Sequence, residues 1–490
     1  MRDLIFPVQH NGETSLQAQL RRQLVDAILD GRLSADDPLP SCRRLAHSLG
    51  VSRNTVVLAY QALTDEGLLI SRERVGYFVN PEIAAEQAEA DGAPREARPA
   101  GPPLDWWEQL KVHPSEQNNI SKPKNWRHFP YPFIYGQADP ELFPTAAWRV
   151  CSREALAVQA IAAWSEDSFG DDDPMLIEEV RTRVLPRRGI KAAASEILIT
   201  MGAQNALYLA AQLLTDADST VGFEDPGYVD ARNIFAMRGA RLKALPVDAE
   251  GMQVDRRLED CDCLYVTPSH QSPTTVTMPI GRRRALLNAA EDDGFVILED
   301  DYEAEINYCS HPTTALKAID TAGRVIYVGS FSKYLAPGLR IGYLVAAEPL
   351  IQEARQLRRL ILRQAPTNNQ RTIALFIAGG YFDALVSRLQ RAYRSRWQAM
   401  AAALNTHLPE ARTTPSSGGT SYWIEGPESL DTDVLARKAL TQGIILEPGS
   451  IHFLSPKPPR NFFRLGFSSI REDKIEPGIK TLAGLIRESG

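Results

Sequence analysis

A lysine that follows a short apolar run is the residue with the clearest capacity for chemistry. The run Val325-Ile326-Tyr327-Val328 leads through Gly329 to Ser330, Ser332 and Lys333, with Arg340 further along. A lysine whose pKa is lowered can form a Schiff base. Serine hydroxyls and an arginine can bind a phosphate, the arginine through two parallel hydrogen bonds. The segment therefore predicts a Schiff-base lysine, Lys333, beside a phosphate site.

Two other segments supply an acid and an anion cradle. Phe295-Val296-Ile297-Leu298 precedes Glu299-Asp300-Asp301-Tyr302, which predicts Asp300 at the carboxyl end of a buried strand. Ile197-Leu198-Ile199-Thr200 precedes Met201-Gly202-Ala203-Gln204, a glycine turn opening a helix whose first N–H groups can hold an anion. Pyridoxal phosphate requires an acid on its ring nitrogen, a lysine on its aldehyde and a phosphate cup. The three segments together fit that cofactor, although each alone is also typical of caps or solvated side chains.

A sheet is needed to bring these groups together. From about residue 127 the sequence alternates apolar runs with helical patterns over more than 350 residues. Such alternation predicts an α/β body with a mostly parallel sheet, whose strands end at one shared edge. We therefore expect Asp300, Lys333 and the glycine turn at Gly202 to meet at that edge.

A smaller body precedes it at residues 1–80. Apolar residues at helical spacing predict helices over 16–30, 41–49 and 52–66, closed by Gly31, Gly50 and Gly67. Two short strands follow, joined across residues 72–76. This order predicts a winged helix-turn-helix, an α+β domain whose third helix would present Arg53, Asn54 and Thr55 to the DNA major groove.

The charge of this small body leaves a second interpretation open. Residues 1–80 hold nine arginines and nine acidic residues, so the basic excess usual in DNA-binding domains is missing. A helical interaction module is therefore the alternative. Arg43, Arg44, Arg53, Arg72 and Arg74 nevertheless lie where a groove-facing surface is expected, which favours DNA binding.

Composition bounds the whole chain. The net charge of −7, the hydrophobic fraction of 44% and the lack of a long apolar run indicate a cytoplasmic protein without a membrane span. Residues 81–126 are rich in Ala, Pro, Gly and charge, which predicts a linker. The five scattered cysteines indicate neither a disulfide framework nor a metal site. We expect a DNA-binding domain at 1–80, a linker at 81–126 and a large body at 127–490.

The small body resembles the GntR family of bacterial regulators. The likeness rests on three segments: Leu39-Pro40-Ser41-Cys42-Arg43-Arg44-Leu45-Ala46, Leu49-Gly50-Val51-Ser52-Arg53-Asn54-Thr55-Val56 and Leu63-Thr64-Asp65-Glu66-Gly67-Leu68. The resemblance implies DNA contacts by Arg43, Arg53, Asn54 and Thr55, and a wing around Arg74 and Gly76 near the minor groove. Val57 stands where the family often has a further arginine.

The large body resembles the fold-type I aminotransferases, with a smaller C-terminal α/β part, and the whole chain resembles the MocR/GabR class of regulators. Five segments carry this likeness in order: Asp225-Pro226-Gly227-Tyr228, Thr267-Pro268-Ser269-His270-Gln271, Glu299-Asp300-Asp301-Tyr302, Ser330-Phe331-Ser332-Lys333 and Pro337-Gly338-Leu339-Arg340-Ile341-Gly342-Tyr343. In that class a GntR-like winged helix is linked to an aminotransferase-like domain.

The resemblance implies a role for each matching residue. Lys333 would carry pyridoxal phosphate, Asp300 would pair with the ring nitrogen, Tyr302 would reach the phenolic oxygen, and Tyr228 would stack on the ring. The phosphate would be held by Gly202, Ala203, Gln204, Ser330, Ser332 and Arg340. Arg464, in Phe462-Phe463-Arg464-Leu465-Gly466, would hold the acid end of an effector; the alternative is a solvated arginine.

Three departures from the family pattern bear on the site. Thr275 replaces a glycine after Pro273-Thr274, and a β-branched residue disfavours positive φ, so we expect a different loop shape. Asp230 stands where members responding to γ-aminobutyrate carry an arginine, which hints at an effector with a second cationic group. The aromatic segment 131–137 fits either an effector pocket or, preferably, core packing.

Two functions remain in view. The favoured one is a homodimeric transcription regulator that binds operator DNA and senses an amine or amino-acid effector through an external aldimine with the cofactor on Lys333. The alternative is a working aminotransferase with an accessory DNA-binding module, since all the groups for transamination are present. The helix-turn-helix favours the regulator, with slow turnover at most.

Overall fold

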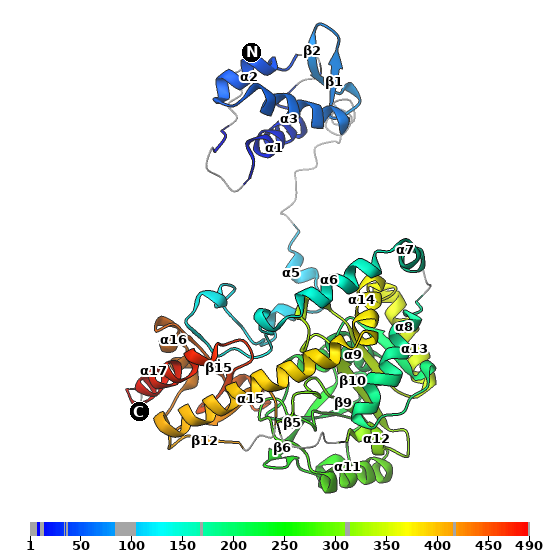
Figure 1. Ribbon diagram of the computed structural model, residues 1–490, viewed down its shortest axis with the longest axis vertical. Helices are drawn as coiled ribbons and strands as arrows, with labels where there is room; N and C mark the ends of the chain where they lie inside the picture. Colours follow the sequence, from blue (N-terminus) through cyan, green and yellow to red (C-terminus); the bar gives the residue numbers. More distant parts are fainter. Residues whose placement is uncertain are drawn as a thin grey trace. The chain divides into compact units, whose positions relative to one another are not determined.

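The computed structural model describes residues 7–9, 14–33, 35, 38–83, 104–166, 170–308, 314–414 and 418–488 (Figure 1). The chain divides into two compact units, Met1–Leu110 and Lys111–Gly490. Residues 111–126, which the sequence analysis places in the linker, fall in the second unit. Most of the rest of that linker, residues 84–103, lies outside the described part, so its boundaries stay a prediction.

The first unit is a winged helix-turn-helix, as predicted. Its elements are α1 (Leu16–Leu29), α2 (Cys42–Leu49), α3 (Arg53–Asp65), β1 (Leu69–Arg72) and β2 (Gly76–Val79), followed by α5 (Trp106–Gln109). The hydroxyls of Ser41 and Ser52 accept hydrogen bonds from the first turns of α2 and α3, and Gly50 ends α2 in a left-handed conformation. β1 and β2 pair antiparallel to form the wing. Local capping interactions therefore set where the helices of this unit begin and end.

The second unit is built on an eight-stranded, mostly parallel sheet, which confirms the predicted fold class. Its strand order is β4 (Ile197–Thr200), β11 (Gly342–Val345), β10 (Val325–Ser330), β9 (Val296–Asp300), β8 (Cys263–Val266), β5 (Thr220–Asp225), β6 (Arg241–Asp248) and β7 (Gly251–Met252). The run from β10 to β6 is parallel, and β11 is antiparallel to both β10 and β4. β4 and β10 therefore run in the same direction.

Helices cover both faces of this sheet (Figure 1). They are α6 (Thr145–Ala155), α7 (Val158–Ser165), α8 (Pro174–Glu179), α9 (Ala203–Leu214), α10 (Val229–Ala236), α11 (Ile280–Asp293), α12 (Leu316–Ile319), α13 (Glu348–Leu362) and α14 (Thr367–Ala378). Side chains alternate along each strand: Leu198 packs with α9 and α13, whereas Ile197 and Ile199 pack with α8 and α14. Burial on both faces explains the continuous apolar runs in the sequence.

A smaller sheet forms the C-terminal part. It has four strands in the order β12 (Arg412–Thr413), β13 (Ser421–Glu425), β16 (Phe462–Gly466) and β15 (Glu447–Pro448), all antiparallel. Nearby lie α15 (Tyr381–His407), α16 (Thr432–Thr441) and α17 (Ile475–Arg487), and β14 (Ile444–Ile445) pairs with β3 (Tyr131–Pro132). This pairing brings the start of the large body beside its C-terminal part.

Among the described residues, no single helix is both long and apolar enough to cross a membrane. α14 and α15 meet those criteria only as a pair, with a 78° bend at the break between them. Both helices contribute to the hydrophobic core of the second unit, through Ile373, Phe376, Leu385 and Leu389.

Candidate functional site

The carboxyl edge of the large sheet gathers the predicted cofactor residues. β9 ends at Asp300, β10 ends at Ser330, and β4 ends at Thr200, directly before the turn at Gly202. These strands run in the same direction, so their ends meet at one edge, where open α/β sheets bind ligands. The sheet therefore brings together residues that lie far apart in the sequence.

Asp300 is a buried carboxylate with one free oxygen. The residue is only 3% exposed, and its Oδ2 accepts a hydrogen bond from the Tyr265 hydroxyl at 2.8 Å. Oδ1 is buried and has no partner among the described residues. Burial raises the pKa of Asp300 to about 7, against the hydrogen bond from Tyr265 and the charge of Lys333. A protonated ring nitrogen would give Oδ1 the missing donor.

Lys333 lies among aromatic rings near this acid. Its Nζ is 4.4 Å from the ring centre of Tyr135 and 5.6 Å from that of Tyr302. A methyl group added to Gly136 would lie 3.0 Å from the same nitrogen, so the chain passes close to the amine there. Burial lowers the pKa of Lys333, which favours the neutral amine that can attack an aldehyde.

The residues of the predicted phosphate cup lie at the ends of β4 and β10 and at Arg340. Gly202 has φ of 78° and precedes α9, and a Cβ at Gly202 would lie 3.3 Å from the Arg340 guanidinium. Arg340 Nη2 donates to the Met201 carbonyl at 3.0 Å. The Ser332 hydroxyl is buried and has no partner among the described residues, and its backbone N–H donates to Ser330 Oγ at 3.3 Å. The cofactor that this acid, lysine and cup fit is pyridoxal phosphate.

The remaining predicted cofactor residues make other contacts. The Tyr302 hydroxyl donates to the His270 carbonyl at 2.7 Å. Asp230 accepts from the Tyr228 hydroxyl at 3.0 Å and from the Gln204 amide at 2.7 Å, and the ring of Tyr228 stacks on that of Tyr265. Asp230 thus holds two of the predicted cofactor residues, and the first turn of α9 offers backbone N–H groups from Ala203 and Gln204. Their roles stay predictions.

Arg464 is buried in β16, at 1% exposure, and is not a solvated arginine. It forms an ion pair with Glu447, and its guanidinium lies 3.8 Å from the ring centre of Tyr135. Burial alone would raise the pKa of Glu447, but Arg464, His452 and Lys122 together hold it at about 2. His452 Nε2 lies 2.8 Å from Glu447 Oε1. Arg464 therefore already holds a carboxylate of its own chain.

Several residues at this end of the site have no sequence signal. Lys122, from the expected linker, donates a hydrogen bond to the Tyr135 carbonyl. Glu303 is 3% exposed, and its Oε2 has no partner among the described residues. Lys122 lies in a segment whose composition indicates a linker. Glu447 and His452 lie in a segment that contains none of the motifs described above. Only their packing places them here.

Two departures noted in the sequence have a structural outcome. Thr275 has φ of 64°, so at this residue the loop keeps the left-handed backbone that glycine prefers, and the expected change of shape is not found there. The aromatic segment 131–137 divides: Phe133 and Ile134 are core residues, whereas Tyr135 contacts Lys333 and Arg464.

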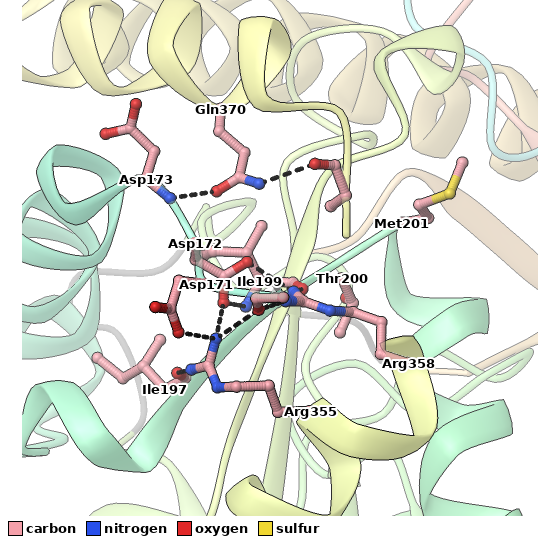
Figure 2. A network of polar contacts seen from close by, with 12 residues as sticks. Asp171, Asp172, Asp173, Ile197, Ile199, Thr200, Met201, Arg355, Arg358 and Gln370 are labelled. Carbon is pink, nitrogen blue, oxygen red and sulfur yellow. Dashed lines mark hydrogen bonds and ion pairs between the residues drawn. The ribbon is translucent and has the colours of Figure 1, made fainter. Parts of the chain in front are cut away.

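A buried charge network supports the strand that leads to the phosphate cup (Figure 2). Asp172 forms ion pairs with Arg355 at 3.0 Å and with Arg358 at 2.6 Å, and its Oδ2 accepts from the Ile199 backbone N–H at 3.2 Å. Arg358 also donates to the Ile199 and Gly170 carbonyls. Both arginines lie on α13. The network joins α13 to β4, three residues before Gly202.

The residues predicted to contact DNA lie at the surface of the first unit. Arg43, Arg53, Asn54 and Arg74 are exposed, and the three arginines form no ion pair with any residue that the structure describes. Thr55 is half-buried, and its hydroxyl lies 2.8 Å from that of Ser52. Gly76 has φ of 136° at the wing, so a side chain there would be strained. Their contacts with DNA stay predictions.

Comparisons with known proteins agree with both units. The model of bacterial regulatory proteins of the gntR family matches residues 16–79, and that of aminotransferase class I and II matches residues 167–482. The HTH-type transcriptional regulator TauR of Rhodobacter capsulatus is 42% identical over 487 residues, covering 98% of this chain and 99% of that one. This chain belongs to the GntR-type transcriptional regulators with an aminotransferase-like domain.

Its other relatives include both regulators and aminotransferases. The probable rhizopine catabolism regulatory protein MocR of Rhizobium meliloti is 30% identical over 97% of this chain and 94% of its own. Aromatic-amino-acid aminotransferase 1 of Thermococcus litoralis is 32% identical over 72% of this chain and 87% of its own. Among solved structures, the kynurenine aminotransferase of Pyrococcus horikoshii has a TM-score of 0.71, with 28% identity, over 78% of this chain and 98% of that one.

Proposed function

We propose that this transcriptional regulator senses an amine or amino-acid effector through pyridoxal phosphate held on Lys333. The observation that carries the proposal is the coexistence, in one chain, of a capped helix-turn-helix and of a buried acid, a lysine and a serine hydroxyl that fit pyridoxal phosphate. An aminotransferase has no use for the first, and a plain repressor has no use for the second. The combination serves a protein whose DNA affinity depends on an amine.

The site residues support a binding event that needs no turnover. Pyridoxal phosphate supplies an aldehyde carbon that binds amines reversibly. Lys333 would hold the cofactor through that carbon, and an effector amine would compete with the lysine amine for it. Arg464 then holds the acid end of the effector, in competition with Glu447. The exchange alters the contacts of Tyr135, which packs on both Lys333 and Arg464, and so shifts the balance between states of different operator affinity.

A homodimer is part of the proposal. Symmetric assemblies of two chains place two winged helices on one DNA molecule, and so favour operators with repeated half-sites. In this arrangement Arg43 and Arg53 would contact DNA from each copy, with Asn54 and Thr55 at the base edges and the wing at Arg74 and Gly76 beside the minor groove.

DNA binding with and without effector tests the proposal. DNA selected from a random-sequence library by the pure protein provides the ligand, and its affinity is measured against a panel of amino acids and amines. We expect one compound to change the affinity of the wild type and not that of Lys333→Ala. Lys191→Ala, which removes an exposed lysine of the same body, is the control and keeps the response. A response that persists in Lys333→Ala contradicts the proposal.

A working aminotransferase is the second candidate function. It is favoured by the likeness to an aromatic-amino-acid aminotransferase and by the presence of Asp300 and Lys333 at the carboxyl edge of the large sheet. Arg464, from β16, contacts the same tyrosine, Tyr135, as Lys333 does. Keto-acid formation from an amino acid in many turnovers per site supports this candidate, whereas conversion of less than one equivalent argues against it.

A further inference from the structure

We propose that Lys122 binds the acid group of the effector together with Arg464, so that the segment leading from the DNA-binding unit supplies part of the effector site. This inference rests on the proposed function and deepens it, because it assigns the acid end of the effector a second cation. Lys122 lies in a segment whose composition indicates a linker, and it belongs to no motif.

The first support is the position of the Lys122 amine. A methyl group at Gly136 would lie 3.0 Å from Lys333 Nζ and 3.9 Å from Lys122 Nζ, so both amines face the same point of the chain. Lys122 also donates to the Tyr135 carbonyl, while Arg464 packs on the Tyr135 ring. Tyr135 and Gly136 thus lie beside the amines of Lys122 and Lys333 and the guanidinium of Arg464.

The second support is the charge balance at this end of the site. The cations near Tyr135 other than Lys333 are Lys122 and Arg464, and Glu447 is the carboxylate paired with Arg464. Glu303 acts on Arg464 and Asp230 acts on Lys122, but among the described residues Lys122 forms no ion pair. Burial lowers the pKa of Lys122 to about 8, with Arg464 and Lys333 adding to the effect and Glu447 and Asp230 opposing it. An acid group beside Lys122 would give this amine an ion pair.

The third support is space. Lys122 and Glu447 both line a cavity of about 480 Å³, within the range of small-molecule sites. The rest of its wall comes from residues 120–123, from α16 and from residues 444–451. It combines apolar side chains such as Leu440 and Ile445 with the charged Asp433 and Arg437 of α16. A short carbon chain with a charged end suits such a wall.

The segment that carries Lys122 is also tied to the predicted cofactor residues at a second point. Gln117 donates to the Asn233 carbonyl at 3.1 Å, and the Asn233 amide donates to the Asn118 carbonyl at 2.8 Å. Asn233 lies one turn after Asp230, which holds Tyr228 and Gln204. Effector binding at Lys122 would therefore act on a segment anchored at both of its ends to the site.

Propionate, an acid without an amine, tests the assignment in the protein loaded with its cofactor. The probe is titrated while the visible absorption of the cofactor is followed in the wild type and in Lys122→Met, Lys122→Arg and Lys124→Met. Loss of a hydrogen bond to a charged group predicts binding weaker by about tenfold or more in Lys122→Met. Lys122→Arg should retain most of the affinity, and Lys124→Met, which removes an exposed neighbour, all of it.

Propylamine, an amine without an acid, provides the matched comparison. Its effect on the absorption should be the same in Lys122→Met as in the wild type, because a merely structural role would change both affinities. Equal propionate affinity in wild type and Lys122→Met, or no propionate binding to the wild type, overturns the assignment. Lys122-dependent propionate binding without any effect of amines on DNA affinity would overturn the proposed function and leave this site standing.

Discussion

Asp300 is a buried acid at the end of β9. Its Oδ1 is buried and has no partner among the described residues, and burial raises its pKa to about 7. An unfolded chain has an aspartate pKa of about 3.9. The folded state therefore binds this proton more tightly than the unfolded state, so the contribution of Asp300 to stability falls as the pH rises from about 4 to about 7.

Asp300→Asn in the cofactor-free protein should remove this pH dependence. Relative to wild type, the variant is expected to gain about 2–3 kcal/mol of unfolding free energy between pH 5 and pH 8, because asparagine carries no buried charge. Chemical denaturation at both pH values measures the difference, and Asp292→Asn, at an exposed position, serves as control. The same pH dependence in Asp300→Asn and wild type would show that Asp300 is not the buried acid described here.

At the residue scale, the sequence predicts the groups that follow apolar runs and misses those placed by packing. Asp300 and Ser330 were predictable because each ends a strand, and Gly202 because it lies in the turn just after β4; strand ends share an edge. Lys122 and Glu447 come together across more than three hundred residues, in segments without a periodic pattern. No pattern among neighbouring residues in the sequence predicts such a long-range contact.

At the scale of elements, β4 depends on the charge network of Asp172, Arg355 and Arg358 (Figure 2). Arg358 is fully buried, and its contacts with Ile199 fix the strand that ends at the phosphate cup. Burial raises the pKa of Asp172, against the charges of both arginines. Removal of one arginine would leave the buried carboxylate of Asp172 with less positive charge to balance it.

Arg358→Met should destabilise the large unit by about 3–5 kcal/mol, the usual effect of breaking a buried ion pair. It should also weaken pyridoxal phosphate binding, because β4 leads directly to Gly202. Arg359→Met, at the exposed neighbouring position of α13, should change neither quantity. Denaturation and cofactor titration of both variants make the comparison. Equal stability of the two variants would mean that the network does not support β4.

The elements themselves were largely predictable, and their order in space was not. Ser41, Ser52 and Gly50 cap the helices of the first unit through local contacts, so their boundaries follow from the sequence. β4 lies at the edge of the large sheet, next to β11, although it precedes every other strand of that sheet in the chain. Such an order arises from long-range pairing, which periodicity does not encode.

At the scale of the whole molecule, the chain forms two compact units: the first carries the GntR-type helix-turn-helix and the second the aminotransferase-like domain. The first unit has no net basic excess, but its exposed arginines without ion pairs are available for phosphate contacts. The second unit holds the cofactor groups and Lys122. We therefore expect a substitution of a DNA-contact residue in the first unit to change DNA affinity and to leave the cofactor groups of the second unit unaffected.

Arg53→Ala should weaken DNA binding and lower the slope of log affinity against log salt concentration by about 1, the value for one phosphate contact. Cofactor absorption should stay unchanged. Arg32→Ala, whose arginine pairs with Asp30 at 2.9 Å, is the control in the same unit and should bind DNA as the wild type does. An unchanged salt slope in Arg53→Ala would remove this arginine from the interface.

The central claim is that an amine binds reversibly at the cofactor held on Lys333, and the visible absorption spectrum tests it most directly. The purified protein is titrated with a panel of amino acids and diamines. The account predicts a yellow absorption band that shifts with one compound and then persists, without a keto product. A band that bleaches to the pyridoxamine form while a keto product accumulates would contradict it and establish a working aminotransferase.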